Sequence, residues 1–464
     1  MLPTPTAATL VGRAARSLRA GRPQVTGRVV RVVGLTFEIE GLEAAIGDMV
    51  RLGDAPGVLG EIVALGDRGP VGMPLGDMRG LHIGTSATLD DAAPGVPVGM
   101  ELLGRVIDGM GNALDDGPSL EHLLRVGIDG TPPHPLRREL VRTPQHLGVR
   151  ALDTLVPCGR GQRLGVFAGS GVGKSSLLSM IIRGTDADIS VLALIGERGR
   201  EVREFIENDL GPEGLARSVV IVATSDQPAL VRLRAAFLAT RIAEWFRDGG
   251  ANVNLLMDSL TRFAMAQREI GLAAGEVPAT RGYPPSMFGL LPKLLERAGA
   301  GEHGSITGIY TVLVEGDDLN DPVGDTARSI LDGHITLSRS LASAGHFPTI
   351  DVLDSVSRVA GAVTTPRQQQ LARELRALLA AYKEARDLVE IGAYRSGTNP
   401  LVDRALVLKD RIDNFLRQRM DEESMPGEAW AQLEQLLSSP MPMNNMAPAN
   451  VANNMGAAGL GVFA

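Results

Sequence analysis

A glycine-rich segment after residue 168 has the composition and spacing of a phosphate-binding loop. The apolar run 164–167 leads into it, and Gly-Lys-Ser follows where a helix is expected to begin, at Lys174. Glycines let backbone N–H groups approach phosphate oxygens closely, and a helix N-terminus adds partial positive charge. The residues predicted to bind a nucleotide here are Gly169, Ser170, Gly171, Val172, Gly173, Lys174, Ser175 and Ser176.

Two side chains of this loop have defined chemical roles. Lys174 is expected to reach the β- and γ-phosphates, and the Ser175 hydroxyl is expected to bind Mg²⁺. The first position of the loop is Ala168 instead of glycine, and a methyl group is tolerated there because the strand becomes the loop at this point. The alternative is an ordinary glycine turn before a buried helix, which does not account for the Gly-Lys-Ser spacing.

Two carboxylates follow other apolar runs of the same kind. Asp258 comes directly after the run 253–257, and Glu197 follows the run 189–195. Because ligands of parallel sheets bind at the carboxyl ends of the strands, Asp258 is predicted to bind Mg²⁺ through water and Glu197 to align water on the γ-phosphorus. Asp258 also opens the next helix and can cap it. On its own segment, Glu197 fits a surface charge cluster equally well.

The composition of the 464 residues limits the class of protein. A net charge of −8 and an aromatic content of 3% argue against a general nucleic-acid binder. The single cysteine, Cys158, excludes an intramolecular disulfide and suits a reducing compartment. No apolar run has the length of a membrane span, and the seven histidines lack metal-ligand spacing. Mg²⁺ bound with a nucleotide is the metal that the sequence indicates.

The length and the changes in pattern predict about three domains. Residues 1–37 contain six arginines and no acid, and residues 10–19 are predicted to form a short helix that docks a partner or an acidic membrane surface. A frayed tail or a transit peptide is the alternative. Further along, short β-type runs separated by Gly, Pro and Asp predict a small β-barrel or sandwich. These runs are 27–33, 35–39, 49–52 and 60–65.

Strand and helix patterns alternate between residues 164 and 314, as in a P-loop α/β domain with a parallel sheet. The apolar runs predicted as buried strands are 164–167, 189–195, 219–223, 253–257 and 306–314. The predicted helices are 177–183 and 229–247 in this part, and 368–391, 401–419 and 428–437 near the C-terminus. The residues from Ser438 onward lack periodicity and are predicted to be disordered.

Several separate motifs, in the same order along the chain, resemble the rotary-type ATPases. This group contains the catalytic subunits of F- and V-type ATP synthases and the ATPases of type III protein export. The resemblance runs from about residue 24 to about residue 435, and it implies an α/β fold: a RecA-like P-loop ATPase core with an N-terminal β-barrel and a C-terminal helical domain. The segments that favour the flagellar export branch are 167–175, with Ala and Ser where synthase catalytic subunits usually have Gly and Thr, 196–205, 257–264 and 281–286.

The resemblance implies roles for charged residues at the site. Glu197 would be the catalytic carboxylate, with Arg198 beside it. The noncatalytic synthase subunits have Gln at that place, so Glu197 argues for an active site. Asp258 would be the Walker B acid, and Arg262 a nearby positioning residue.

Phosphoryl transfer also requires cations around the transferred group, commonly an arginine, but the spacing of the many arginines selects none of them. The resemblance implies that Arg358 is an arginine finger inserted into a neighbour's site; an interface salt bridge is the alternative. A finger that acts in a neighbour requires a ring, so a homohexamer is implied. Phe347 would pack against the adenine ring, with simple core packing as the alternative.

The resemblance also implies partners and a location. ATP hydrolysis, with Mg²⁺, would help release export substrates from chaperones and feed them to a membrane export gate, at the cytoplasmic face of the inner membrane and without nucleic acid. A stator-like regulatory protein would bind the N-terminal helix, and a central stalk protein and export chaperones would bind near residues 382–399. The implied divisions are 1–23 (docking helix or tail), 24–95 (barrel collar), 96–365 (ATPase domain), 366–437 (helical domain) and 438–464 (disordered tail).

Other functions fit parts of the same sequence. The runner-up is a virulence-type type III secretion ATPase, which the sequence barely separates from the flagellar kind. An F- or V-type synthase catalytic subunit fits the loop less well and would copurify with a second, related chain. An RNA translocase is disfavoured by the negative charge and the few aromatic residues. Glu197 argues against a noncatalytic nucleotide-binding subunit.

Overall fold

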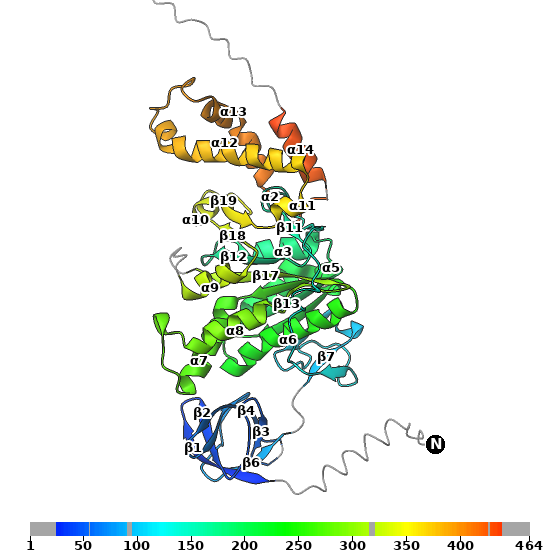
Figure 1. Cartoon of the computed structure of the whole chain (residues 1–464), viewed down its shortest axis with the longest axis vertical. Coiled ribbons are helices and arrows are strands. Elements are labelled where there is room, and N and C mark those ends of the chain that lie inside the picture. The colour runs from blue at the N-terminus through cyan, green and yellow to red at the C-terminus, as the bar shows by residue number, and fades with distance from the viewer. Residues whose placement is uncertain (1–24, 55, 91–94, 315–320, 426, 439–464) are drawn as a thin grey trace, which may run out of the picture.

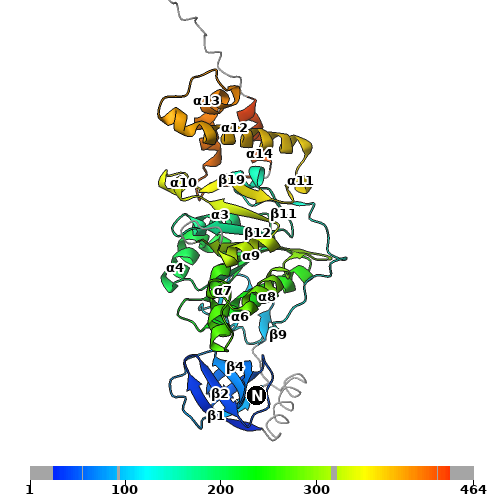
Figure 2. The same ribbon diagram turned by 60° about the vertical axis from the view of Figure 1, so that its left-hand side comes forward.

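The computed structural model describes residues 25–54, 56–90, 95–314, 321–425 and 427–438. A closed barrel, a central α/β part and a group of helices follow one another along the long axis of the molecule (Figure 1, Figure 2). This architecture is the one that the sequence predicts. The predicted helix at 10–19 and the predicted disorder of 439–464 lie outside the described residues.

Antiparallel strands close the N-terminal barrel. In order around the barrel they are β1 (Thr26–Val33), β2 (Thr36–Glu40), β5 (Gly69–Pro74), β4 (Val58–Gly66), β3 (Met49–Leu52) and β6 (Ser86–Leu89). Phe37 fills the interior, and a Cβ at Gly60 or Gly72 would lie 2.6 or 2.3 Å from its ring. Glycine is therefore required at both positions. Closure also leaves no strand edge of this sheet unpaired.

A single sheet, parallel along most of its width, forms the centre of the molecule. Its order is β19 (Ile350–Ser357), β18 (Gly333–Leu337), β12 (Arg163–Ala168), β17 (Ser305–Leu313), β15 (Asn252–Asp258), β13 (Ile189–Ile195), β14 (Ser218–Ala223) and β8 (Arg105–Asp108), with β16 (Gly299–Ala300) beside β17. The five predicted strands are confirmed as β12 to β15 and β17. The sequence reading missed β8, β18 and β19, because they are short or only alternately buried and lack a continuous apolar run.

Helices cover both faces of this sheet (Figure 1). Along β13, Val191 and Ala193 belong to one apolar core, whereas Leu192 and Leu194 belong to the other. Burial on both faces explains why the central strands read as unbroken apolar runs. The helices are α2 (Arg150–Leu155), α3 (Lys174–Gly184), α4 (Gly199–Glu204), α5 (Gly211–Ala216), α6 (Ala229–Asp248), α7 (Leu260–Ala273), α8 (Pro285–Leu295), α9 (Pro322–Ile330), α10 (Arg339–Ser343) and α11 (Ala360–Val363).

Short elements complete the central part. They are the strands β7 (Val96–Val98), β9 (Leu124–Val126), β10 (Pro144–Gln145) and β11 (Cys158–Gly159), the 3₁₀ turns η1 (Met100–Leu102) and η3 (Thr280–Gly282), and the π-helical turn η2 (Phe205–Leu210). Cys158 is buried, and burial raises the pKa of its thiol. This supports a structural role for the cysteine. Among the described residues, no helix combines the length and apolarity needed to cross a membrane.

The C-terminal part is helical, as predicted. Its helices are α12 (Pro366–Glu390), α13 (Pro400–Leu416) and α14 (Glu428–Leu437). The prediction placed the end of the second helix at Arg419, which is wrong: α13 ends at Leu416, and Arg417 is extended. The buried side chain of Arg150 donates hydrogen bonds to the carbonyl oxygens of Phe415 and Arg417, so the chain turns here towards α2. A contact so distant in sequence leaves no local signal.

A buried ion pair ties α6 to the residues that follow α8. Glu244 and Arg297 are 1% and 3% exposed, and the Nε–Oε1 and Nη2–Oε2 distances between them are both 2.7 Å. Removing one partner leaves the other charge buried without compensation, which costs about 3–5 kcal/mol.

We predict that Glu244→Ala destabilises the central part by about 3–5 kcal/mol. The measurement is urea unfolding followed by the fluorescence of Trp245, with Trp430, the other of the two tryptophans, changed to Phe. The matched control is Glu434→Ala, which removes a pair with Arg367 whose side chains are 49% and 52% exposed and should cost less than about 1 kcal/mol. An unfolding midpoint for Glu244→Ala equal to that of the control would contradict the prediction.

Candidate active site

The phosphate-binding loop joins β12 to α3 as the sequence predicts. Ala168 is the last residue of the strand, and α3 begins at Lys174. Gly171 and Gly173 have φ values of 75° and 89°, a left-handed conformation in which a side chain is strained. These residues therefore have to be glycine for the loop to curl around a ligand.

A cavity of about 880 Å³ opens in front of this loop. Of the predicted loop residues, all except Val172 line it: Gly169, Ser170, Gly171, Gly173, Lys174, Ser175 and Ser176. Val172 is buried in the core beside α3, and its carbonyl oxygen accepts a 2.6 Å hydrogen bond from Thr349 Oγ1. The buried side chain and the hydrogen-bonded carbonyl group of Val172 thus anchor the loop to the core.

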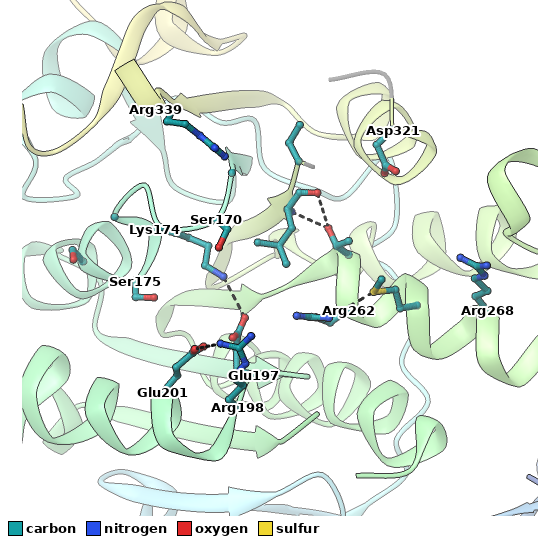
Figure 3. A pocket seen from close by; sticks show the side chains of 18 of the residues that line it. Ser170, Lys174, Ser175, Glu197, Arg198, Glu201, Arg262, Arg268, Asp321 and Arg339 are labelled. Atoms are coloured by element: carbon teal, nitrogen blue, oxygen red, sulfur yellow. Dashed lines mark hydrogen bonds and ion pairs between the residues drawn. The ribbon is translucent and has the colours of Figure 1, made fainter. Parts of the chain in front are cut away.

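The ammonium of Lys174 lies between two carboxylates. Its Nζ is 2.5 Å from Asp258 Oδ1 and 3.3 Å from Glu197 Oε1, and Figure 3 shows Lys174 and Glu197 pointing towards one another. Burial by itself would lower the pKa of Lys174, but the two carboxylates outweigh burial and raise it, so the ammonium stays charged. Burial also raises the pKa of Glu197, against the opposing effect of Lys174. A raised pKa makes this carboxylate a better proton acceptor near neutral pH.

Asp258 is the last residue of β15 and is 3% exposed. The alternative that it caps the next helix is wrong, because Ser259 has that role: its side chain accepts a hydrogen bond from the backbone N–H of Arg262. Instead, Asp258 Oδ1 accepts a 2.7 Å hydrogen bond from the Thr311 hydroxyl on β17. Thr311 and Lys174 together fix the orientation of this carboxylate.

Arg198 and Arg262 also line the cavity, but their settings differ. Arg262 lies against Gly196, where a Cβ would come within 3.0 Å of it, and its Nε is buried without a hydrogen-bond partner. Figure 3 shows its guanidinium extending into the cavity beside Glu197. Arg198 is 75% exposed in its side chain and pairs with Glu201 at 3.0 Å. Arg262 is thus held in place, whereas Arg198 lies at the open rim.

Phe347 lies beside the loop and not in the core. It is 49% exposed, and a Cβ at Gly173 would lie 3.7 Å from its ring. The alternative of simple core packing is therefore wrong. A half-exposed aromatic face next to a phosphate-binding loop is suited to stacking on a flat ring.

Arg358 lies at the end of the sheet opposite to the phosphate-binding loop, where β12 begins. Its backbone N–H donates to Asp332 O at 2.9 Å, and Asp332 N–H donates to Arg163 O at 2.8 Å, which places Arg358 level with the first residue of β12. The phosphate-binding loop leaves the other end of β12 after Ala168, about 17 Å further along at the rise of a strand. Arg358 therefore does not reach the cavity of its own chain. Of the other predicted residues, Asp258 contacts Lys174 and Phe347 lies beside Gly173, although neither lines the cavity itself.

The structure adds residues that sequence reasoning did not assign. Besides those already described, the cavity is lined by Glu201, Thr261, Met265, Arg268, Arg281, Tyr283, Leu313, Val314, Asp321 and Arg339. Arg281 and Tyr283 belong to the segment 281–286 that carried part of the resemblance, which was the available signal. Thr311 was missed because a threonine inside an apolar strand has no distinctive spacing.

The donor set fits Mg²⁺ that is bound together with a nucleotide. Within the described ranges, no group of three or more His, Cys, Asp or Glu side chains could hold a metal ion. Mg²⁺ usually takes one or two protein ligands and completes its shell with water and substrate phosphates. The exposed Ser175 hydroxyl and the Asp258 carboxylate provide this minimal set beside the loop.

Family models match most of the chain. Residues 148–357 match the ATP synthase alpha/beta family, nucleotide-binding domain, and residues 364–435 match the T3SS EscN ATPase C-terminal domain. The first match runs from α2 to β19 and includes every strand of the central sheet except β8, and the second covers most of the C-terminal helical part.

Curated relatives and solved structures extend this similarity. The flagellum-specific ATP synthase of Bacillus subtilis is 49% identical over 414 residues, 88% of this chain and 94% of that protein. The type 3 secretion system ATPase of Xanthomonas euvesicatoria is 47% identical over 424 residues, 91% of this chain and 96% of that protein. The structure of the assembled ATPase EscN from the enteropathogenic E. coli type III secretion system has a TM-score of 0.85 and 44% identity, and covers 89% of this chain and 100% of that one.

These similarities confirm the family resemblance that the sequence motifs carry. The fold agrees with it. The chain belongs to the ATP synthase alpha/beta family, in the branch that contains the flagellum-specific and type 3 secretion ATPases.

Proposed function

We propose that this protein hydrolyses ATP to energise flagellar type III protein export, acting on chaperone–substrate complexes at the base of the export apparatus. The observation that carries the proposal is the ammonium of Lys174, which lines the cavity with Glu197 and contacts both Glu197 and the buried Asp258. A charged lysine, a carboxylate for water and a carboxylate for Mg²⁺ are the groups that ATP hydrolysis requires. The flagellum-specific relatives at 49% identity support the export role.

The loop side chains bind and neutralise the phosphates in this proposal. Lys174 contacts the β- and γ-phosphate oxygens, and the N–H groups of the loop surround them. Ser175 and Asp258 hold Mg²⁺, which when bound neutralises charge on the β- and γ-phosphates. Phe347 packs against the adenine ring, which places the triphosphate along the loop.

Glu197 accepts a hydrogen bond from the attacking water and aligns it on the γ-phosphorus. Its raised pKa lets the carboxylate take a proton more readily as the water attacks. Arg262, held against Gly196, adds positive charge on the same side of the cavity, and Arg198 contributes from the rim.

Arg358 completes the site of a neighbouring subunit. Its place at the opposite end of the parallel strands, about 17 Å from its own loop along the strand direction, supports action in trans. Because one chain carries both the loop and the arginine, a closed ring of identical subunits satisfies every site, and we propose a homohexamer. The solved structure of EscN, which is that of an assembled ATPase, supports this arrangement.

The flanking parts of the chain receive roles by the same proposal. We assign residues 1–23 to docking of a stator-like regulatory protein, 24–95 to the collar of the ring, 96–365 to catalysis and 366–437 to contacts with a central stalk, chaperones and export substrates. The structure of EscN in complex with its central stalk EscO, with a TM-score of 0.83, supports the stalk contact. The protein then works in the cytoplasm, against the inner membrane, beside the export gate.

A virulence-type secretion ATPase is the second candidate. Type 3 secretion system ATPases are as similar to this chain as the flagellar ones, at 47% and 49% identity. The chemistry of the site is the same for both, so the neighbouring genes distinguish them: flagellar structural genes support the first proposal, and secretion-needle genes the second.

We predict that Glu197→Gln lowers the turnover number by about 10²- to 10⁴-fold, because the amide cannot accept the proton of the attacking water. ATP binding should be retained, since Lys174 and the loop are unchanged. The measurement is steady-state turnover together with equilibrium nucleotide binding. The matched control is Glu204→Gln, an exposed carboxylate on α4 that pairs with Arg200 outside the cavity. Normal turnover in Glu197→Gln would remove Glu197 from the mechanism.

The action of Arg358 in trans predicts complementation between two inactive variants. Lys174→Ala lacks the loop lysine and Arg358→Ala lacks the finger, but in a mixed ring the finger of the first meets the loop of the second. An equimolar mixture should regain about a quarter of the wild-type sites. At each interface, the subunit that supplies the loop must be Arg358→Ala and the subunit that supplies the finger must be Lys174→Ala, and each choice has a chance of about one half. Mixed rings that stay inactive would place Arg358 outside the neighbour's site.

Thr311 is predicted to act through Asp258. Thr311→Val removes the hydroxyl that orients this carboxylate, so the Mg²⁺ concentration for half-maximal turnover should rise about 10-fold or more. Thr311→Ser keeps the hydroxyl and should behave as wild type. The measurement is turnover as a function of Mg²⁺ at saturating ATP. An unchanged Mg²⁺ requirement in Thr311→Val would show that Thr311 only fills space.

A further inference from the structure

Buried polar contacts hold the residues after α13 against the start of α2. The Arg150 side chain, in a residue 7% exposed, donates to Phe415 O at 3.1 Å and to Arg417 O at 2.6 Å. It also pairs with the Glu422 carboxylate. The linker that joins the second C-terminal helix to the last one is therefore fixed to the central part of the molecule.

Gln418 lies in the middle of this linker and is 5% exposed. Its Oε1 accepts a 2.9 Å hydrogen bond from the backbone N–H of Arg150. Its Nε2 donates to Gly148 O at 2.8 Å and to Glu422 O at 2.9 Å. The side-chain amide thus has partners for both its donor and its acceptor, which fixes the position of its own backbone.

The backbone of Gln418 is hydrogen-bonded to Phe347, the residue that we propose packs against the base. The N–H of Gln418 donates to Phe347 O at 3.0 Å. On the other side, Thr349 Oγ1 donates to Val172 O at 2.6 Å, and the Phe347 ring lies next to Gly173. Phe347 is therefore held between the phosphate-binding loop and the end of α13.

We propose that Gln418 is a positioning residue for nucleotide binding, which holds Phe347 in place for the base and couples this position to the C-terminal helices. The inference rests on the proposed function, in which Phe347 packs against adenine. A displacement of α13 moves Gln418 and, through the hydrogen bond, Phe347. The affinity for ligands with a base then changes, whereas the affinity for a bare phosphate chain does not.

The competing account is that Gln418 only satisfies buried polar atoms and stabilises the fold. The two accounts differ in which ligands are affected. A structural defect near the loop lowers the affinity for every ligand of the site, but a displaced Phe347 lowers the affinity only for ligands that carry a base. Inorganic tripolyphosphate has the charges of a nucleotide and no base, so it separates them.

The experiment uses the full-length protein with Gln418→Met, which keeps the volume of the side chain and removes its hydrogen bonds. Equilibrium binding of ADP and of tripolyphosphate is measured with Mg²⁺. We expect the dissociation constant of ADP to rise about 5- to 30-fold, the effect of losing one or two hydrogen bonds, and that of tripolyphosphate to stay within about twofold. Gln418→Ala is the second variant where the methionine variant folds poorly.

A double-mutant cycle tests the route through Phe347. Phe347→Ala should weaken ADP and spare tripolyphosphate, and adding Gln418→Met to it should cause no further loss, because the residue being positioned is already absent. Additive losses, or equal weakening of both ligands by Gln418→Met, overturn the proposal in favour of a structural role.

The matched control is His146→Leu, which removes the ring nitrogens and with them the hydrogen bond to the linker. His146 holds the same linker through Ser424 O, at 2.5 Å from its Nε2, but does not contact Phe347, so ADP binding should be unchanged. An equal loss in the control shows general loosening and overturns the proposal. If Gln418→Met binds ADP with wild-type affinity while Phe347→Ala binds it weakly, the positioning role of Gln418 is refuted and the adenine contact of Phe347 stands. Wild-type ADP affinity in Phe347→Ala refutes the adenine contact itself.

Discussion

The charge of the Lys174 ammonium, whose side chain is 12% exposed, is the constraint on which the site depends. An ammonium removed from water without a partner is strongly unfavourable, so carboxylates have to reach it. The strand order β12, β17, β15, β13 brings Asp258 and Glu197 from other strand ends to the lysine that follows β12. β17 lies between β12 and β15 and supplies Thr311, which orients Asp258. The groups that balance the charge of the lysine are thus the ones to which we assign roles in hydrolysis.

The same sheet explains why Arg358 lies away from the nucleotide site of its own subunit. The parallel strands bring the phosphate-binding loop, Asp258 and Glu197 together at their carboxyl ends. Because β19 runs antiparallel to its neighbour β18, it ends at the opposite end of the sheet. The residue after β19 is Arg358, so the strand direction carries this cation away from its own nucleotide site. In the proposed ring of identical subunits, Arg358 of one subunit is assigned to the nucleotide site of the next.

Much of the site follows from the sequence because its parts obey local rules. A strand, a glycine turn and Gly-Lys-Ser predict the loop, and acids after apolar runs predict Asp258 and Glu197. What could not be predicted depends on contacts between distant residues. Thr311 matters through its neighbour across the sheet, and α13 ends where it does because Arg150, more than 260 residues earlier, binds its last carbonyl groups. Arg358 needed the resemblance, since no spacing separates it from the other arginines.

The junction between the α/β part and the C-terminal helices is polar where it matters for coupling. Apolar surfaces can slide past one another at little cost, but the hydrogen bonds of Gln418 are directional and are lost together when its backbone moves. Coupling between binding sites is reciprocal. A partner that displaces the C-terminal helices and weakens nucleotide binding must therefore be bound less tightly, by the same factor, when nucleotide is present.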